Sequence, residues 1–242
     1  MKNILIYTIF RNSSQKIEQY YSQIKSIVEH FPNYNFYISL YENDSTDDTK
    51  IKLNNLDWSF AKDFSIICEN IGTEFFHSVK DEQRVKNLAA ARNKAIEAKN
   101  FLNNVDHILD IESDMRFDLQ DVEKILNFQE TYNLTKVDIV SMVSKGTNGK
   151  LYDVWATRRH ADEDRGKLHK DWDITPFGKY YSTCNGVCLF DAKPFQDGAR
   201  YGWFNERFKK FDCDTSIICE EFHLRGYSEI YINHTAICYH DQ

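Results

Sequence analysis

Glycine and proline are scarce in this sequence, with nine and three occurrences among 242 residues. Together with 42% hydrophobic residues, this composition is typical of a folded globular chain and excludes collagen-like or low-complexity sequence. Neither glycine-rich phosphate-binding pattern, G-x-G-x-x-G or the P-loop, occurs. A phosphate group bound by this chain would therefore need a cation or arginine side chains.

An excess of positive charge is also missing, since the formal net charge is −7. Binding along a nucleic acid backbone needs a basic surface, so we expect no nucleic acid partner. No run approaches the roughly 20 apolar residues of a membrane span. The N-terminal stretch lacks the long apolar core and small-residue cleavage site of a signal peptide. These absences predict a soluble, cytoplasmic protein without a transmembrane segment.

The six cysteines lack the C-x2-C pairs that are typical of a zinc site. In the cytoplasm, thiols are kept reduced. We therefore expect free thiols and no structural zinc.

Apolar runs alternate with helical patterns through the first part of the chain. The predicted strands cover residues 3–10, 33–41, 63–70 and 106–111. The predicted helices cover residues 13–31, 47–56 and 82–102. This alternation predicts an α/β fold with a Rossmann-like, mainly parallel sheet flanked by helices. Ligands of such sheets bind beyond the carboxyl ends of the strands.

The second part of the chain is less regular. It predicts a helix at 119–132 and a strand at 137–144, followed by an irregular segment. The Asn185-Gly186 dipeptide between apolar runs is typical of a type I′ hairpin turn. A helix stopped at Gly226 and a final strand or two close the chain. No linker or repeat divides the sequence, so we expect a single domain.

Three carboxylates lie at the end of one predicted buried strand, in the segment "DIESDM". If the strand persists, Asp110, Glu112 and Asp114 share one face. Carboxylates this close repel one another unless a cation joins them, and hard oxygen ligands suit Mg²⁺ or Mn²⁺ bound together with a diphosphate. The alternative is a strand that leaves the core, with its acids merely solvated.

Arg92 interrupts the apolar stripe of the helix at 82–102, four residues after Leu88. Because an unpaired buried charge is costly, Arg92 must meet an anion or a carbonyl. Arg84 begins the same helix. Our hypothesis is that these arginines contact ligand phosphates or the metal-binding acids. The alternative for Arg92 is an internal ion pair with Asp110 or Glu42.

Aromatic and acidic residues in the second half have open interpretations. Asp153 and Trp155 stand beside two arginines, which suits either sugar stacking or a core tryptophan with solvated arginines. Asp214 and Glu220 lie near the final helix and are either catalytic acids or surface acids. His240 becomes interesting only if the fold returns it to the metal.

Taken together, these segments resemble the GT-A fold of nucleotide-sugar glycosyltransferases. The resemblance is closest to glycosyltransferase family 69, the fungal capsule-associated α-1,3-mannosyltransferases. The loop "YENDSTDDT" is similar to the "YENDSTDGT" of that family. Four further segments follow in the order of the family, namely "LAAARN", "ESDMRF", "YDVWATRR" and "TCNGVCLFDAKPF".

The resemblance implies a metal-dependent glycosyltransferase that moves a hexose to a hydroxyl of a glycan acceptor, with retention. The donor would be a nucleotide sugar, with GDP-mannose favoured over a UDP-sugar. Residues 1–115 would form the nucleotide-sugar-binding half and residues 116–242 the acceptor-side half of one GT-A-like domain spanning 1–242.

The same resemblance assigns roles to individual residues. The implied donor-binding residues are Thr8, Arg11, Glu42, Asp44, Arg84, Arg92 and Glu112. The metal, Mn²⁺ or Mg²⁺, would be held by Glu112, Asp114 and His240. The implied catalytic acids are Asp214 and Glu220, and the implied acceptor-side residues are Asp153, Trp155 and Asn185.

One departure from the family pattern motivates an alternative. The acidic pair near the C-terminus of the family is kept at Asp214, but Ile217 stands at the second position. The alternative function is therefore a catalytically inactive GT-A-like protein that binds a nucleotide sugar or a glycan.

Overall fold

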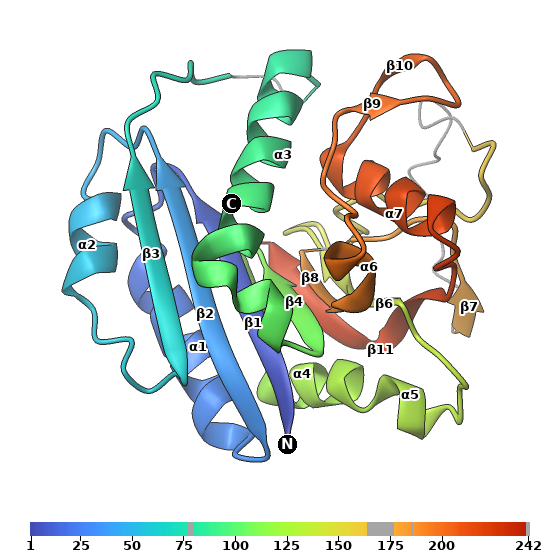
Figure 1. Ribbon diagram of the computed structural model, residues 1–242, viewed down its shortest axis with the longest axis horizontal. Coiled ribbons are helices and arrows are strands. Elements are labelled where there is room, and N and C mark those ends of the chain that lie inside the picture. The colour runs from blue at the N-terminus through green and yellow to red at the C-terminus, as the bar shows by residue number, and fades with distance from the viewer. Residues whose placement is uncertain (77–79, 164–176, 185, 241–242) are drawn as a thin grey trace.

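A computed structural model describes residues 1–76, 80–163, 177–184 and 186–240 (Figure 1). Its main sheet has nine strands within these residues, in the order β3-β2-β1-β4-β8-β6-β11-β5, with β7 paired to β11. The strands of the main sheet are β1 (Lys2–Phe10), β2 (Tyr34–Asn43), β3 (Asp63–Glu69), β4 (His107–Ile111), β5 (Met115–Phe117), β6 (Ile139–Lys145), β7 (Phe177–Lys179), β8 (Val187–Asp191) and β11 (Ile230–His240). A separate two-stranded ribbon joins β9 (Phe204–Asn205) and β10 (Lys210–Phe211).

Helices cover both faces of the main sheet. They are α1 (Ile17–His30), α2 (Thr49–Asn55), α3 (Glu82–Glu97), the 3-10 helix η1 (Ala98–Asn104), α4 (Leu119–Leu126), α5 (Phe128–Thr131), α6 (Lys193–Gln196) and α7 (Asp214–Leu224). Alternation along β1 divides the core, because Ile4 and Ile6 pack with α1 and α4, whereas Leu5 and Tyr7 pack with α3 and α7.

The N-terminal half is parallel, as its alternating pattern predicts. β1 pairs in parallel with β2 and β4, and β2 pairs in parallel with β3. Figure 1 shows this half in blue and green on the left and the C-terminal half in orange and red on the right. The α/β prediction is confirmed, and the carboxyl ends of β1, β2 and β4 meet at one edge.

The C-terminal half makes the sheet mixed. β8 is antiparallel to both β4 and β6, and the long strand β11 is parallel to β6 but antiparallel to β5 and β7. The predicted turn at Asn185-Gly186 includes Asn185, which lies outside the described residues. β8, which follows it, pairs with β4 and β6. Gly186 has a φ of +73°, and Gly226, at +82°, follows the end of α7 as expected.

Two predicted helices are shorter than their apolar patterns. The helix at 82–102 ends at Glu97 and continues as η1, inside which Lys99 and Asn100 have positive φ values. The helix at 119–132 is divided at Asn127 into α4 and α5. In both cases the apolar spacing continues across the break, so the pattern alone shows no boundary.

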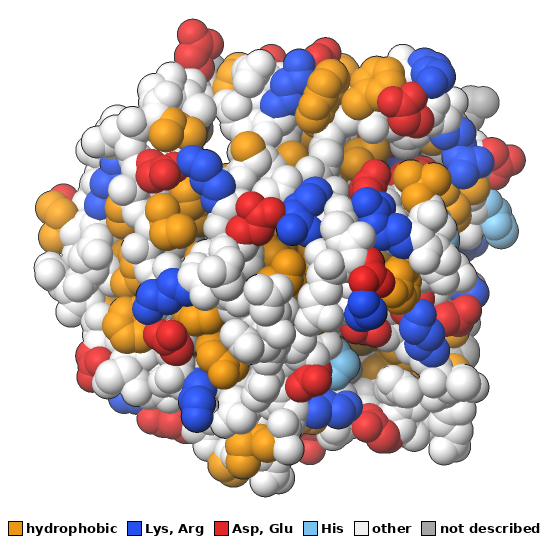
Figure 2. Space-filling model, viewed as in Figure 1, with side chains coloured by type: hydrophobic (Ala, Val, Ile, Leu, Met, Phe, Trp, Pro, Cys, Tyr) orange, Lys and Arg blue, Asp and Glu red, His pale blue; other side chains and the backbone are white. Residues whose placement is uncertain are grey.

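Among the described residues, the face of the molecule in Figure 2 shows no large basic patch. Figure 2 shows acidic and basic side chains interspersed over one face of the molecule. Within the part of the chain that the structure describes, none of the helices is long and apolar enough to cross a bilayer. All six cysteines are free thiols, as predicted.

Candidate active site

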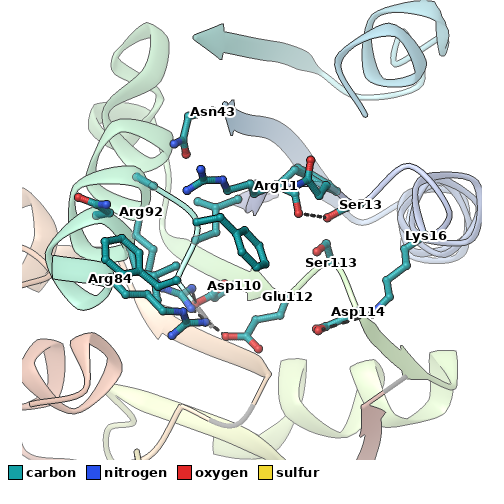
Figure 3. A pocket seen from close by; sticks show the side chains of 18 residues that line it. Arg11, Ser13, Lys16, Asn43, Arg84, Arg92, Asp110, Glu112, Ser113 and Asp114 are labelled. Carbon is teal, nitrogen blue, oxygen red and sulfur yellow. Dashed lines mark hydrogen bonds and ion pairs between the residues drawn. The ribbon is translucent and has the colours of Figure 1, made fainter. Parts of the chain in front are cut away.

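A cavity of about 370 Å³ lies beyond the carboxyl ends of β1, β2 and β4. Its polar and aromatic lining includes Arg11, Lys16, Asn43, Phe75, Phe76, Arg84, Arg92, Asp110, Glu112 and Asp114. Figure 3 shows Asn43 and Arg11 toward one side of this cavity and Glu112 and Asp114 toward the other. The position agrees with the ligand site expected for an α/β sheet.

Arg92 is the centre of a buried ionic cluster. Its guanidinium donates to Asp110, Glu112 and Asp214 at 2.9, 2.8 and 2.8 Å, and only 4% of the residue is exposed. Although burial opposes the charge, Asp110 and the other carboxylates raise the pKa of Arg92 well above its ordinary value. The predicted ion pair with Asp110 is thus present, together with two further partners.

Asp110, in β4, is the second buried residue of this cluster. Its carboxylate accepts from the Tyr7 hydroxyl at 2.7 Å, and the Tyr201 hydroxyl bonds to that of Tyr7, also at 2.7 Å. Burial raises the pKa of Asp110 in spite of the attraction of Arg92. Only 4% of Asp110 is exposed. Its role in this arrangement is to fix the arginine.

The three acids of "DIESDM" do not share one strand face, because β4 ends at Ile111 and a turn follows. Glu112 turns to Arg92, whereas Asp114 accepts from His240 Nε2 at 2.8 Å and lies 3.8 Å from Lys16 Nζ. Burial, opposed by Arg92 and reinforced by Asp114, raises the pKa of Glu112 to about 7. The turn therefore divides the acids between two partners.

Strand pairing places His240 beside the acids, although it is far from them in the sequence. β11 pairs with β5 so that His240 lies opposite Met115, next to the turn that carries Asp114. The ring of Tyr152 stacks on the imidazole, with centroids 3.9 Å apart and an interplanar angle of 18°. Nδ1 of His240 is buried without a hydrogen-bond partner. Nε2 of His240 and the carboxylate of Asp114, 2.8 Å apart, are the two ligand atoms that a cation between them could use.

These ligand atoms suit a divalent-cation site that keeps coordination positions open, rather than one filled by protein ligands alone. Among the described residues, no three His, Cys, Asp or Glu side chains converge as a metal cage. Asp114 and His240 form a contacting pair, with Glu112 at the same turn. Few protein ligands, with the remaining positions taken by phosphate oxygens and water, are typical of Mg²⁺ and Mn²⁺ in phosphoryl-substrate sites.

Asp44 and Arg11 hold the loop that follows β3. The carboxylate of Asp44 accepts from the backbone N–H groups of Ile71, Gly72 and Thr73. Although burial opposes ionisation, these bonds and the Thr73 hydroxyl keep the pKa of Asp44 well below its usual range. Arg11 donates to the Thr73 carbonyl at 2.6 Å. Both predicted donor-binding residues thus shape the cavity wall, and Arg11 also lines the cavity.

Glu42 and Thr8 are fully buried beside the cavity instead of lining it. Glu42 accepts from Ser45 N–H at 2.7 Å and lies 3.6 Å from Lys50 Nζ, so it folds the "ENDSTDDT" loop. The Thr8 hydroxyl donates to the Ile111 carbonyl at 2.6 Å and also bonds to Tyr20. Their donor-binding roles stay predictions.

The N-terminal turn of α3 contributes Arg84 to the cavity. Asp81 caps this helix by accepting from the Arg84 backbone N–H at 3.1 Å. Figure 3 shows Arg84 and Arg92 on the α3 side and Lys16 across the cavity from them. Both arginines thus line the cavity, and their phosphate contacts stay predictions.

The two predicted catalytic acids are separated by the helix that carries both. Asp214 begins α7, is 4% exposed and bonds to Arg92, so it joins the central cluster. Glu220 accepts from the Tyr181 hydroxyl at 2.5 Å and lies 4.0 Å from Arg207, outside the cavity lining. The structure therefore brings Asp214, but not Glu220, to the acids of β4.

The predicted acceptor-side residues are placed unevenly. Asp153 is half-buried, and burial together with Glu112 and Asp214 raises its pKa to about 8. Trp155 is half-buried, and its carbonyl accepts from Ser216 at 3.4 Å. Asn185 lies outside the described residues. Neither Asp153 nor Trp155 lines the cavity, although burial and the carboxylates of Glu112 and Asp214 raise the pKa of Asp153.

The arginines beside Trp155 are not both solvated. Arg158 is fully buried and forms an ion pair with Asp212, which also accepts from Asn205 at 3.0 Å. This pair joins the irregular segment to the residue that precedes α7 by two positions. The solvated-arginine alternative is therefore wrong for Arg158.

Sequence reasoning missed several residues of the site, among them a lysine, a tyrosine and a phenylalanine. Lys16 contacts Asp114, Tyr152 stacks on His240, and Phe75 lines the cavity. The available signals were a lysine just before the first long helix, the tyrosine of "YDVW", and an aromatic pair within the polar segment "TEFFHS".

Comparison with known proteins gives a family and a fold. A family model described as "Cryptococcal mannosyltransferase 1" matches residues 3–222. No relative is found among curated proteins.

Several solved structures share the architecture at low sequence identity. TarS of S. aureus has a TM-score of 0.60 and 12% identity over 100% of this chain, which spans 37% of TarS. Residues 1–349 of TarS in complex with UDP-GlcNAc have a TM-score of 0.56 and 13% identity. This match covers 100% of this chain and 59% of the TarS fragment. The mannosyltransferase PcManGT from Pyrobaculum calidifontis was solved in complex with GDP-Man and Mn²⁺. It has a TM-score of 0.58 and 12% identity, and the match covers 98% of this chain and 56% of PcManGT. This chain thus spans well under two thirds of each of these structures.

Proposed function

This chain belongs to the cryptococcal mannosyltransferase 1 family and has the GT-A fold, and from that premise we propose that it is a divalent-metal-dependent glycosyltransferase. The proposed reaction moves mannose from GDP-mannose, with retention, to a hydroxyl of a glycan acceptor. PcManGT was solved with GDP-Man and Mn²⁺, and TarS with UDP-GlcNAc. The family and PcManGT together favour GDP-mannose as the donor.

The observation that carries the proposal is the pairing of Asp114 with His240 at the cavity edge, beside Glu112. These residues are far apart in the sequence and meet only through the pairing of β11 with β5. Carboxylate and imidazole ligands at a strand end are suited to a divalent cation whose remaining coordination positions are filled by a diphosphate. Such a cation, when bound, would neutralise charge on the leaving diphosphate.

The chain supplies the remaining interactions. Arg84 on α3 provides a positive charge at the cavity wall for phosphate oxygens. Arg92 is committed to three carboxylates and is therefore proposed as a positioning residue, which holds Glu112 at the cavity and Asp214 behind it, outside the cavity lining. Asp214 is the acid proposed to face the reacting carbon or the acceptor hydroxyl. Asp153 and Trp155 belong to the proposed acceptor side, and Glu220 has no place in this centre.

Donor binding is tested by thermal denaturation with GDP-mannose and UDP-GlcNAc, each with and without Mn²⁺. A ligand that binds only the folded state raises the melting temperature by mass action. We expect a metal-dependent rise with GDP-mannose, which Asp114→Asn reduces and the control Asp121→Asn leaves unchanged. Asp121 pairs with Lys124 on α4, outside the cavity.

Transfer is tested by following GDP release and product formation with a panel of glycan acceptors. Donor binding without transfer to any acceptor would favour the inactive nucleotide-sugar-binding alternative. Full transfer by Asp114→Asn in the presence of a chelator would contradict the role of the metal. The absence of binding to any nucleotide sugar would overturn the proposal as a whole.

A further inference from the structure

The segment that follows β3 reaches the cavity at Phe75, and we define residues 71–75 as the strap. Asp44 holds the strap, accepting from the N–H groups of Ile71, Gly72 and Thr73 at 2.8, 2.9 and 3.0 Å. Asp44 has a φ of +58°, a conformation that Asn and Asp tolerate better than most residues. Three backbone donors on one carboxylate fix the path of an otherwise exposed loop.

Two further side chains tie the strap to the cavity wall. Arg11, after β1, donates to the carbonyls of Thr73 and Glu74 at 2.6 and 2.9 Å. The Asn43 amide, at the end of β2, donates to Asp44 and to the Thr73 hydroxyl, both at 2.9 Å. The strap is therefore pinned by the ends of two neighbouring parallel strands.

These contacts present an aromatic ring at the cavity. Phe75 is 60% exposed and lines the cavity, and the guanidinium carbon of Arg11 lies 5.7 Å from its ring centroid. Leaving so large an apolar side chain in water forfeits the free energy of its burial. A ring that is held at a polar cavity by polar anchors is suited to a flat ligand.

The distance from the strap to the acidic turn, which we define as residues 112–114, matches the length of a nucleoside diphosphate. Glu112 follows β4 and Asn43 ends β2, with β1 between them. Neighbouring strands are about 4.8 Å apart, so the two ends are separated by roughly 10 Å. Figure 3 shows the same order across the cavity, with Arg11 between Asn43 and the acids. A nucleoside diphosphate spans such a distance from its base to its terminal phosphate.

We propose that Phe75 is the stacking platform for the nucleobase of the donor, and that Asp44 and Arg11 are the residues that position it. The inference rests on the proposed function, because it takes the diphosphate to lie at Glu112 and Asp114. It changes the role of Asp44 from a direct nucleoside contact to the anchor of the strap. Since every base has an aromatic face, the platform accepts purine and pyrimidine donors alike.

The test compares the affinities of two probes in the presence of Mn²⁺, GDP and inorganic pyrophosphate, by titration calorimetry. Phe75→Ala is expected to weaken GDP binding roughly 5- to 150-fold, the range that one stacked base contributes, and to leave pyrophosphate binding unchanged. Phe75→Trp is expected to restore GDP binding. Ile71→Ala is the matched control, because Ile71 is 51% exposed in the same strap but does not line the cavity.

The anchor is tested with Asp44→Ala. Loss of the acceptor for three N–H groups is expected to speed hydrogen exchange at residues 71–73 and to weaken GDP binding as Phe75→Ala does, again without an effect on pyrophosphate. Asp44→Asn keeps one acceptor oxygen and is expected to give intermediate values. Equal losses for GDP and pyrophosphate would contradict the positioning role.

The outcomes separate this inference from the proposed function. If the wild-type protein binds neither GDP nor UDP with Mn²⁺, the proposed function fails. If it binds GDP and Phe75→Ala binds it equally well, the nucleobase platform is wrong while the proposed function stands. Loss of GDP binding in Phe75→Trp as well as in Phe75→Ala would also overturn the stacking role.

Discussion

Arg92 shows how much of this site depends on one side chain. A guanidinium has five donors in a planar fork, and here three of its bonds go to three different carboxylates. The helical pattern predicts a buried arginine, with Asp110 or Glu42 as a candidate ion-pair partner. It does not indicate Asp214, which is 122 residues away. The partners of a buried charge are set by the fold around it.

Replacing Arg92 with methionine is expected to lower the free energy of unfolding by about 3–5 kcal/mol, because three carboxylates lose their shared buried partner. Urea denaturation measures this change. The control is Lys25→Met on α1, which breaks an exposed pair with Glu29 and is expected to cost less than about 1 kcal/mol. Equal losses in the two variants would show that the cluster contributes no more than a surface ion pair.

Asp153 gives the stability of the protein a dependence on pH. Burial, with Glu112 and Asp214 nearby, raises the pKa of Asp153 to about 8, whereas an unfolded aspartate titrates near pH ~3.9. The folded state therefore binds the proton more tightly, and this contribution to stability is lost as pH rises from about 4 to 8. An asparagine at this position cannot ionise, so the variant does not lose this stability as the pH rises.

The expected result is that Asp153→Asn melts at least about 2 °C above the wild type at pH 8, with a smaller difference at pH 5. Differential scanning calorimetry at several pH values measures it. Asp63→Asn is the control, because a hydrogen bond from Lys99 lowers the pKa of Asp63 and its effect is constant above pH 5. A difference for Asp153→Asn that does not grow with pH would contradict the raised pKa.

At the scale of elements, the turn between β4 and β5 decides where the acids point. Gly186, just before β8, accepts from the Glu112 backbone N–H at 2.9 Å. A Cβ at Gly186 would lie 2.5 Å from the Met115 side chain, and the φ of +73° already favours glycine. The missing side chain at residue 186 therefore leaves room for Met115, which follows the acidic turn.

Gly186→Ala is expected to displace Met115 and the turn before it, and so to weaken Mn²⁺ binding about tenfold or more, as disturbed support of metal ligands does. Isothermal titration with Mn²⁺ measures the affinity. Gly149→Ala is a close control, since Gly149 has a φ of +72° with nothing within 4 Å of its added Cβ. Its expected cost is backbone strain of about 1–2 kcal/mol without any effect on the metal. Equal Mn²⁺ affinity in both variants would contradict this account.

At the scale of the whole molecule, buried contacts join the two halves. Arg92 and Tyr7, from residues 1–115, bond to Asp214 and Tyr201, from residues 116–242. One apolar cluster also includes Leu5 and Ala95 together with Ile218 and Phe222. Neither half retains this cluster by itself, so the predicted single domain is expected to behave as one cooperative unit.

A single unfolding transition is the expected result for the full chain. The enthalpy measured directly by calorimetry should equal the van't Hoff enthalpy, and the transitions seen by far-UV circular dichroism and by tryptophan fluorescence should coincide. Two resolved transitions would contradict the single domain. A second transition that appears only in Arg92→Met would instead identify the ionic cluster as the coupling between the halves.

The sequence by itself determined the elements of the N-terminal half, because buried parallel strands and amphipathic helices have distinct periods. It also determined, through five ordered segments, the resemblance that the family match confirms. The tertiary structure decided which residues meet. Asp214 joins Arg92, His240 joins Asp114, and Glu220 points elsewhere, because strand pairing and helix packing bring together residues that are far apart in the chain. No local pattern carries that information.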